Sequence, residues 1–139
     1  METEYINLSL MEDTGNELSG IPESTDYDLQ SFSYNIKREV SQSINSTSLS
    51  KIGVIKVVMS SFPSDQLVRW AFDAGKHLYG LINIRKDKNT IPHESILVTR
   101  ARCTRLILHY KLDRNDEIQL ALDILPETMT VHGEEITNN

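Results

Sequence analysis

The sequence is poor in cysteine, in long apolar runs and in recognisable leader segments. Cys103 is the only cysteine among 139 residues, so neither an intramolecular disulfide nor a pair of thiolate metal ligands can form. The longest apolar runs, such as Val57–Met59 and Leu106–Leu108, are far short of the roughly 20 residues that span a bilayer. No basic segment followed by an apolar stretch opens the chain, so we expect no signal peptide. These absences predict an intracellular protein.

Motifs that carry catalysis or bind cofactors are also missing. The four histidines are His77, His93, His109 and His132, and no two of them have the one-turn helical spacing of a metal site. No glycines flank a serine as in a nucleophile elbow, and no glycine-rich phosphate loop is present. We therefore predict no enzymatic activity, no metal and no cofactor. A small hydrolase remains an alternative that would need a pocket lined by His or Ser.

Charge is distributed unevenly along the chain. Residues 1–36 hold eight acids and no Lys or Arg, whereas residues 37–126 hold all 14 basic residues against nine acids. An acidic segment interrupted by glycine and proline buries too little apolar surface to offset the entropy of ordering. The interpretation is an acidic disordered tail at 1–36, a single domain at 37–126 and an acidic C-terminal tail at 127–139.

Hydrophobic periodicity places a strand and a helix at the start of the predicted domain. The continuous β-branched run at 52–59 predicts a buried strand. Ser64 and Asp65 suit the N-terminus of a helix, and Gly80 suits its C-terminal stop. The sequence thus predicts one main amphipathic helix at about 64–79, with an apolar stripe made by Leu67, Val68, Ala71, Phe72, Leu78 and Tyr79.

Strict alternation predicts a hairpin near the C-terminus. Leu106, Leu108, Tyr110 and Leu112 alternate with polar and apolar neighbours, and a second alternating run contains Ile118, Leu120, Leu122 and Ile124. Two such runs around a four-residue polar turn indicate an antiparallel hairpin. The predicted fold class is α+β, with an antiparallel or mixed sheet covered by the helix.

A basic segment between residues 85 and 111 is the main candidate binding feature. Its members are Arg85, Lys86, Lys88, Arg100, Arg102, Arg105 and Lys111. Gathered on one face, they would attract the phosphates of nucleic acid or of anionic lipids. The alternative is a solvated surface whose charges point in several directions. Polyanion partners are therefore a nucleoprotein, RNA or an anionic membrane.

A second candidate lies in the predicted acidic tail. Tyr5 and Leu8 form a Tyr-x-x-Leu pattern, a form that docking motifs use, and a disordered setting would expose it. The hypothesis is that Tyr5 and Leu8 dock a host or partner protein.

Residues 54–85 resemble the core of rhabdovirus matrix proteins. The likeness rests on the strand Val54–Val58 with Lys56, on the turn Ser61-Phe62 and on the helix that ends at His77–Tyr79. The resemblance implies a viral structural protein of the virion or host cytoplasm that self-associates and contacts ribonucleoprotein and membrane.

The functional prediction is accordingly a non-enzymatic binding or assembly protein, with a viral matrix protein as the specific form. The alternative is an intracellular adaptor or a virus movement-type protein that docks a partner through its acidic tail. Sedimentation with liposomes or RNA would separate the two.

Overall fold

The chain forms eleven strands and one short helix among the residues that the structure describes. The computed structural model describes residues 4–12, 24–39, 49–112 and 117–138. Its elements are β1 (Tyr5–Glu12), β2 (Ser24–Leu29), β3 (Ser31–Ser33), β4 (Ile36–Glu39), β5 (Leu49–Ile52), β6 (Ile55–Met59), α1 (Asp65–Phe72), β7 (Leu78–Arg85), β8 (Glu94–Lys111), β9 (Glu117–Leu125), β10 (Thr128–Val131) and β11 (Glu134–Thr137).

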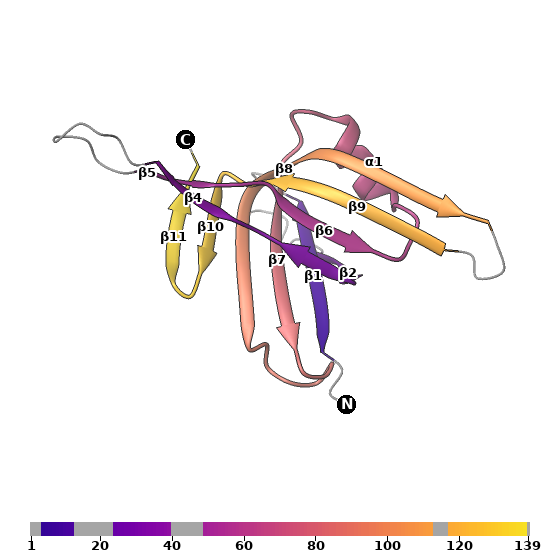
Figure 1. Ribbon diagram of the computed structural model, residues 1–139, viewed down its shortest axis with the longest axis horizontal. Coiled ribbons are helices and arrows are strands. Elements are labelled where there is room, and N and C mark those ends of the chain that lie inside the picture. The colour runs from indigo at the N-terminus through magenta and orange to yellow at the C-terminus, as the bar shows by residue number, and fades with distance from the viewer. Residues whose placement is uncertain (1–3, 13–23, 40–48, 113–116, 139) are drawn as a thin grey trace, which may run out of the picture.

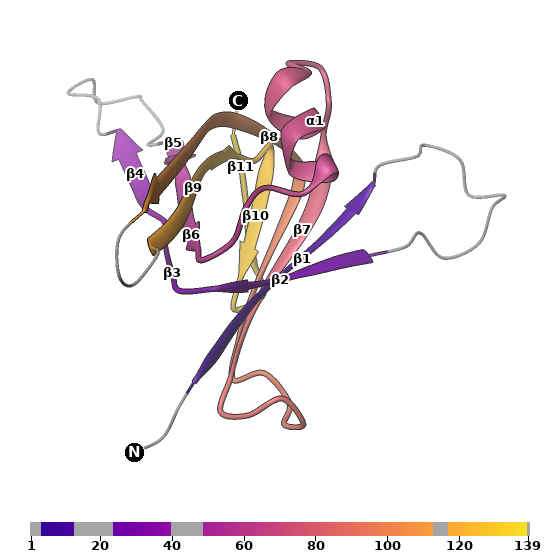
Figure 2. The ribbon, with the colours of Figure 1, turned by 90° about the vertical axis from the view of Figure 1, so that its right-hand side faces the viewer.

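One antiparallel sheet dominates the molecule. Its strands follow the order β2-β1-β7-β8-β9-β6-β3, with β10 and β11 attached beside β8. β8 has 18 residues and joins the two halves of the sheet. Its first part pairs with β7 and β10, and its second part pairs with β9. Figures 1 and 2 show the sheet as strongly curved, with β8 running through both halves.

The core lies on the concave side of this curved sheet. On β6, Ile55, Val57 and Met59 are buried while Lys56 is exposed, which is the period of two that a half-buried strand requires. β9 repeats the pattern through Leu120, Leu122 and Ile124. Burial of this alternating face fixes the register of each strand, because a slip of one residue would turn its apolar side chains to solvent.

The helix α1 packs on β8. Ser64 is the N-cap, and its Oγ accepts a hydrogen bond from the Leu67 backbone nitrogen at 3.2 Å, as predicted for an N-cap serine. Leu67 and Trp70 are buried. The Tyr27 hydroxyl lies 2.7 Å from the Ser64 Oγ, so the start of the helix is also connected to β2.

The predicted helix at 64–79 is too long. α1 ends at Phe72, with Asp73 as its C-cap. Phe72, which the predicted apolar stripe includes, is 86% exposed, whereas Trp70, which the stripe omits, is buried. Leu78 and Tyr79 begin β7 because their backbones pair with β1 and β8. Gly80 lies inside β7 and does not stop a helix.

The predicted disordered acidic tail is wrong for the described part of residues 1–36. β1 pairs with both β2 and β7, and Leu8 and Leu10 are each 1% exposed. Asp26 and Asp28 are exposed and Glu12 pairs with Lys76, so the negative charge does not prevent Ile6, Leu8 and Leu10 from joining the core. Residues 13–23 lie outside the described ranges. Near the C-terminus, β10 and β11 form a hairpin that pairs with β8.

The predicted hairpin is confirmed. β8 and β9 pair antiparallel, with Leu106 opposite Leu122 and Leu108 opposite Leu120. The fold class is nevertheless wrong, because one helix of eight residues accompanies a β-rich fold. No helix in the described ranges is long and apolar enough to cross a membrane.

Candidate functional site

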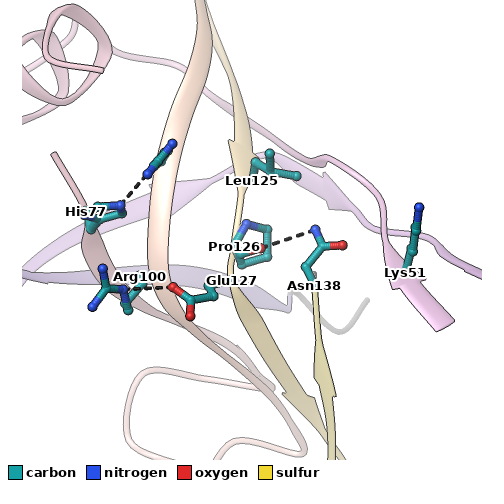
Figure 3. A pocket seen from close by; sticks show the side chains of 8 residues that line it. Lys51, His77, Arg100, Leu125, Pro126, Glu127 and Asn138 are labelled. Carbon is teal, nitrogen blue, oxygen red and sulfur yellow. Dashed lines mark hydrogen bonds and ion pairs between the residues drawn. The ribbon is translucent and has the colours of Figure 1, made fainter. Parts of the chain in front are cut away.

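A basic pocket lies where β7, β8 and the C-terminal hairpin meet. Its volume is about 530 Å³. Eight residues line it, and we call it the arginine pocket: Lys51, His77, Arg100, Arg102, Leu125, Pro126, Glu127 and Asn138. Figure 3 shows Arg100, Glu127 and His77 at one end, Pro126 in the middle and Lys51 beyond Asn138.

Irregular pairing of β8 places the two arginines at the pocket. The register between β7 and β8 shifts between Leu78 and Gly80, opposite Arg100. Arg100 has a φ of 46°, in the left-handed region that bulky residues rarely adopt. A second register shift follows between Cys103 and Arg105 in the pairing with β9. Such bulges bend a strand and change the direction of its side chains, and they are enriched near functional sites.

Each arginine of the pocket is held through its Nε. The Arg100 Nε lies 2.8 Å from Glu127 Oε2, and the Arg102 Nε donates to His77 Nε2 at 2.9 Å. His77 Nε2 therefore serves as the acceptor for Arg102 in this arrangement. Lys51, Arg100 and Arg102 are the cationic side chains that line the pocket, and Glu127 is its carboxylate.

Asn138 closes the pocket on the side of the C-terminal strand. Its side-chain nitrogen donates to the Ile52 carbonyl oxygen at 3.1 Å and to the Pro126 carbonyl oxygen at 3.4 Å. Its backbone nitrogen donates to the Glu127 carbonyl oxygen at 2.6 Å. The end of the described chain is therefore attached to β5 and to the turn after β9.

The seven basic residues predicted to share one surface lie in four places. Arg100 and Arg102 line the arginine pocket. Arg85 and Lys88 line another cavity of about 280 Å³ together with Tyr5, Asn7, Asp26 and Asp28. Lys86 is exposed at the loop that follows β7, and Arg105 and Lys111 are exposed on the second part of β8. The length and bend of β8 thus separate basic residues that lie close together in the sequence.

The predicted docking residues Tyr5 and Leu8 do not lie together on the surface. Tyr5 is 37% exposed, and the Lys88 Nζ lies 5.7 Å from the centre of its ring. Leu8 points into the core and is 1% exposed. A partner could contact Leu8 only if β1 left the sheet.

Sequence reasoning missed His77, Glu127 and Asn138 as parts of one site. They are far apart in the chain, and only the pairing of β7, β8 and β10 brings them together. Among the described residues, no group of His, Cys, Asp and Glu is arranged to hold a metal ion. The chemistry available in the arginine pocket is anion recognition by guanidinium groups.

Comparison with known proteins identifies the fold. The family model for hemolysin coregulated protein Hcp (TssD) matches residues 7–139. Hcp1 from Flavobacterium johnsoniae is 17% identical, with a TM-score of 0.70, and the match covers 94% of this chain and 98% of that one. Hcp1 from Salmonella typhimurium is 15% identical, with a TM-score of 0.64 and coverage of 96% and 92%.

A third similar structure belongs to a large assembly. A chain of the anti-feeding prophage baseplate, determined with six-fold symmetry, is 13% identical, with a TM-score of 0.61 and coverage of 94% of both chains. No curated protein matched the sequence.

These matches overturn the viral prediction. The likeness to rhabdovirus matrix proteins rested on residues 54–85 alone, whereas the matching family model extends from residue 7 to residue 139. The predicted strand, turn and long helix are a strand, a short helix and another strand in the structure. A viral matrix protein, a virion or host-cytoplasm location, and the adaptor or movement-type alternative are all wrong.

Proposed function

The chain belongs to the hemolysin coregulated protein (Hcp, TssD) family, and from this membership we propose that it is a structural subunit of a type VI secretion apparatus that assembles with copies of itself into rings. The family match over residues 7–139 carries the proposal. One structural neighbour is described as a type six secretion system protein, with a TM-score of 0.67.

The prediction that the chain is not an enzyme is confirmed, because Hcp is a structural secretion protein. Of the predicted partners, self-association agrees with the family, whereas a polyanion partner has no support from it. Self-association requires a surface that a second copy of the chain can cover.

The outer part of the β8–β9 hairpin offers such a surface. Leu108, Tyr110 and Leu112 continue the apolar face of β8 past the core and are 39%, 46% and 79% exposed. The Phe62 ring, 55% exposed, lies 5.4 Å from the Tyr110 ring. We call these four residues the hairpin patch. Figure 1 shows the ends of β8 and β9 extending away from the rest of the sheet.

A contiguous apolar patch on a projecting element is typical of an interface. In a ring, each subunit presents one surface to the neighbour ahead and a different surface to the neighbour behind. The hairpin patch would be one of these two surfaces. Six-fold symmetry in the baseplate neighbour is the reason to expect six copies.

Sedimentation velocity of the purified chain tests the proposal. The wild-type protein should sediment as a ring-sized species at micromolar concentration. Leu108→Glu places a charge in the hairpin patch, and it should shift the protein to monomer because an unpaired charge in an apolar interface is costly. Arg105→Glu is the matched control, because Arg105 is exposed on the same strand outside the patch. A monomeric wild-type protein at all concentrations would overturn the proposal.

A further inference from the structure

The cavity of about 280 Å³ beside β1 holds side chains of both charges, and we call it the mixed-charge cavity. Its lining consists of Tyr5, Asn7, Asp26, Asp28, Arg85 and Lys88. Two cations and two carboxylates are among these side chains, so the formal charges of the lining cancel. No residue of the hairpin patch lines it, and binding in it does not require the assembly proposed above.

The register of β1 with its two neighbours brings this lining to one place. Leu8 points into the core, so Asn7 and, two residues earlier, Tyr5 face the opposite side of the sheet. Arg85 on β7 lies opposite Tyr5. Asp28 on β2 lies opposite Asn7. Arg85 and Asp28 therefore approach the same two side chains of β1 from its two sides.

Two of the four charged side chains already have a neighbour that holds them. The Lys88 Nζ lies 5.7 Å from the centre of the Tyr5 ring. The Ser9 Oγ donates a hydrogen bond of 2.5 Å to Asp26 Oδ1. These contacts fix one cation and one carboxylate at the edge of the cavity.

The other two charged groups, Arg85 and Asp28, remain available to a ligand. The Arg85 Nε is buried and has no hydrogen-bond partner among the described residues. Buried N–H groups in native proteins almost always have an acceptor, so this unused donor indicates that an acceptor is missing. In the described part of the chain, no ion pair joins Arg85 or Lys88 to Asp26 or Asp28.

The distance between the two available groups suits a molecule that carries both charges. Arg85 and Asp28 are two strands apart and offset by two residues. With strands about 4.8 Å apart and a rise of about 3.4 Å per residue, their backbones are about 12 Å apart. A small zwitterion placed over Tyr5 and Asn7 can contact both side chains, with its negative end at Arg85 and its positive end at Asp28.

We propose that the mixed-charge cavity binds a free α-amino acid, with its carboxylate on Arg85 and its ammonium on Asp28. A carboxylate accepts paired hydrogen bonds from a guanidinium, and it would supply the acceptor that the Arg85 Nε lacks. Tyr5 is 37% exposed and offers its ring to an apolar or aromatic side chain of the ligand. A cavity of about 280 Å³ is small for a binding site, which favours a single amino acid over a peptide.

Isothermal titration calorimetry of the full chain at low ionic strength tests the proposal with three probes. Phenylalanine carries both charges, 3-phenylpropionate lacks the ammonium, and phenylalaninamide lacks the carboxylate. Phenylalanine should bind at least about tenfold more tightly than either single-charge probe, because each of them leaves one charged group of the cavity unpaired. No binding of phenylalanine, or binding of a single-charge probe as tight as that of phenylalanine, would overturn the proposal.

Replacing Arg85 separates a binding role from a structural one. Arg85→Met should weaken phenylalanine binding by about tenfold or more, and it should leave the thermal midpoint unchanged or raised because it removes a buried donor that has no partner. Lys86→Met is the matched control, since Lys86 is the neighbouring cation, exposed and outside the cavity. The control should bind phenylalanine as the wild type does.

Replacing Asp28 tests the orientation of the ligand. Asp28→Asn should weaken binding of phenylalanine and leave that of 3-phenylpropionate unchanged or stronger, because only phenylalanine has an ammonium group to pair with Asp28. Glu135→Gln, at an exposed acid on β11, should change neither affinity. Wild-type affinity for phenylalanine in both Arg85→Met and Asp28→Asn would show that the amino acid binds elsewhere and would reject the proposed site.

Discussion

The indole Nε1 of Trp70 donates a hydrogen bond of 2.9 Å to the backbone carbonyl oxygen of Ala101. This bond joins α1 to β8 just where β8 passes from its pairing with β7 to its pairing with β9. Trp70 and Ala101 are both buried. The only tryptophan of the chain thus fixes the helix beside the arginine pocket, because Arg100 and Arg102 flank Ala101.

Removing this hydrogen bond should destabilise the fold measurably. Trp70→Phe keeps an aromatic ring but leaves the Ala101 carbonyl oxygen without the indole donor. Loss of a buried hydrogen-bond partner costs about 1–3 kcal/mol of unfolding free energy, to be measured by urea denaturation. Phe72→Ala, on the same helix but 86% exposed, should cost less than about 0.5 kcal/mol. Equal costs would mean that Trp70 does not anchor α1.

The two faces of the β8–β9 hairpin should differ strongly in their response to truncation. Leu120 is 0% exposed, and its neighbour Gln119 is exposed. Leu120→Ala should lower the unfolding free energy by about 2–5 kcal/mol, and Gln119→Ala by well under about 1 kcal/mol. Similar small losses at both positions in urea denaturation would contradict the register of β9.

Gly80 should be intolerant of a side chain for reasons of space. A Cβ at Gly80 would lie 2.8 Å from Val98 Cγ2, so Gly80→Ala should cost about 1–3 kcal/mol through overpacking. Gly75→Ala is the control, because a Cβ there meets only Asp73 Oδ1 at 3.5 Å. Adding Val98→Ala should reduce the effect of Gly80→Ala. If the double variant shows no such compensation, the close approach of β7 and β8 is not the cause.

Cys103 should react slowly in the folded protein. Burial raises the pKa of the Cys103 thiol, partly opposed by a backbone hydrogen bond at Arg105, and the negative charge of Asp123 raises it further. Less thiolate forms at pH 8 than in the unfolded chain, so alkylation by iodoacetamide should be slower in the native protein than in urea. The unfolded thiol also ionises at lower pH than the folded one, so its ionisation should lower stability as the pH rises above about 8.5. Equal alkylation rates in buffer and urea would contradict this environment.

Local patterns predicted the elements whose evidence lies within a few neighbouring residues. The alternation of Leu106, Leu108 and Leu120, Leu122 predicted the hairpin, and Ser64 was correctly assigned to the N-terminus of the helix. β1 could have been found the same way, because Ile6, Leu8 and Leu10 alternate with polar residues. The acids around them do not exclude a strand, because they lie outside this alternating apolar set.

Features that depend on distant pairing could not be read from the sequence. Leu78 and Tyr79 fit a helical stripe, and only their partners in β1 and β8 show that they belong to a strand. The arginine pocket depends on two register shifts and on a positive φ at Arg100. A run of basic residues gave no sign that β8 would bend and separate them.

Native mass spectrometry of the wild-type chain tests self-assembly, the central claim, most directly. The chain has a mass of 15.8 kDa, and we predict a dominant species of six times that mass, which Leu108→Glu converts to the single-chain mass. A wild-type spectrum that shows only the single-chain mass at every concentration would contradict the account.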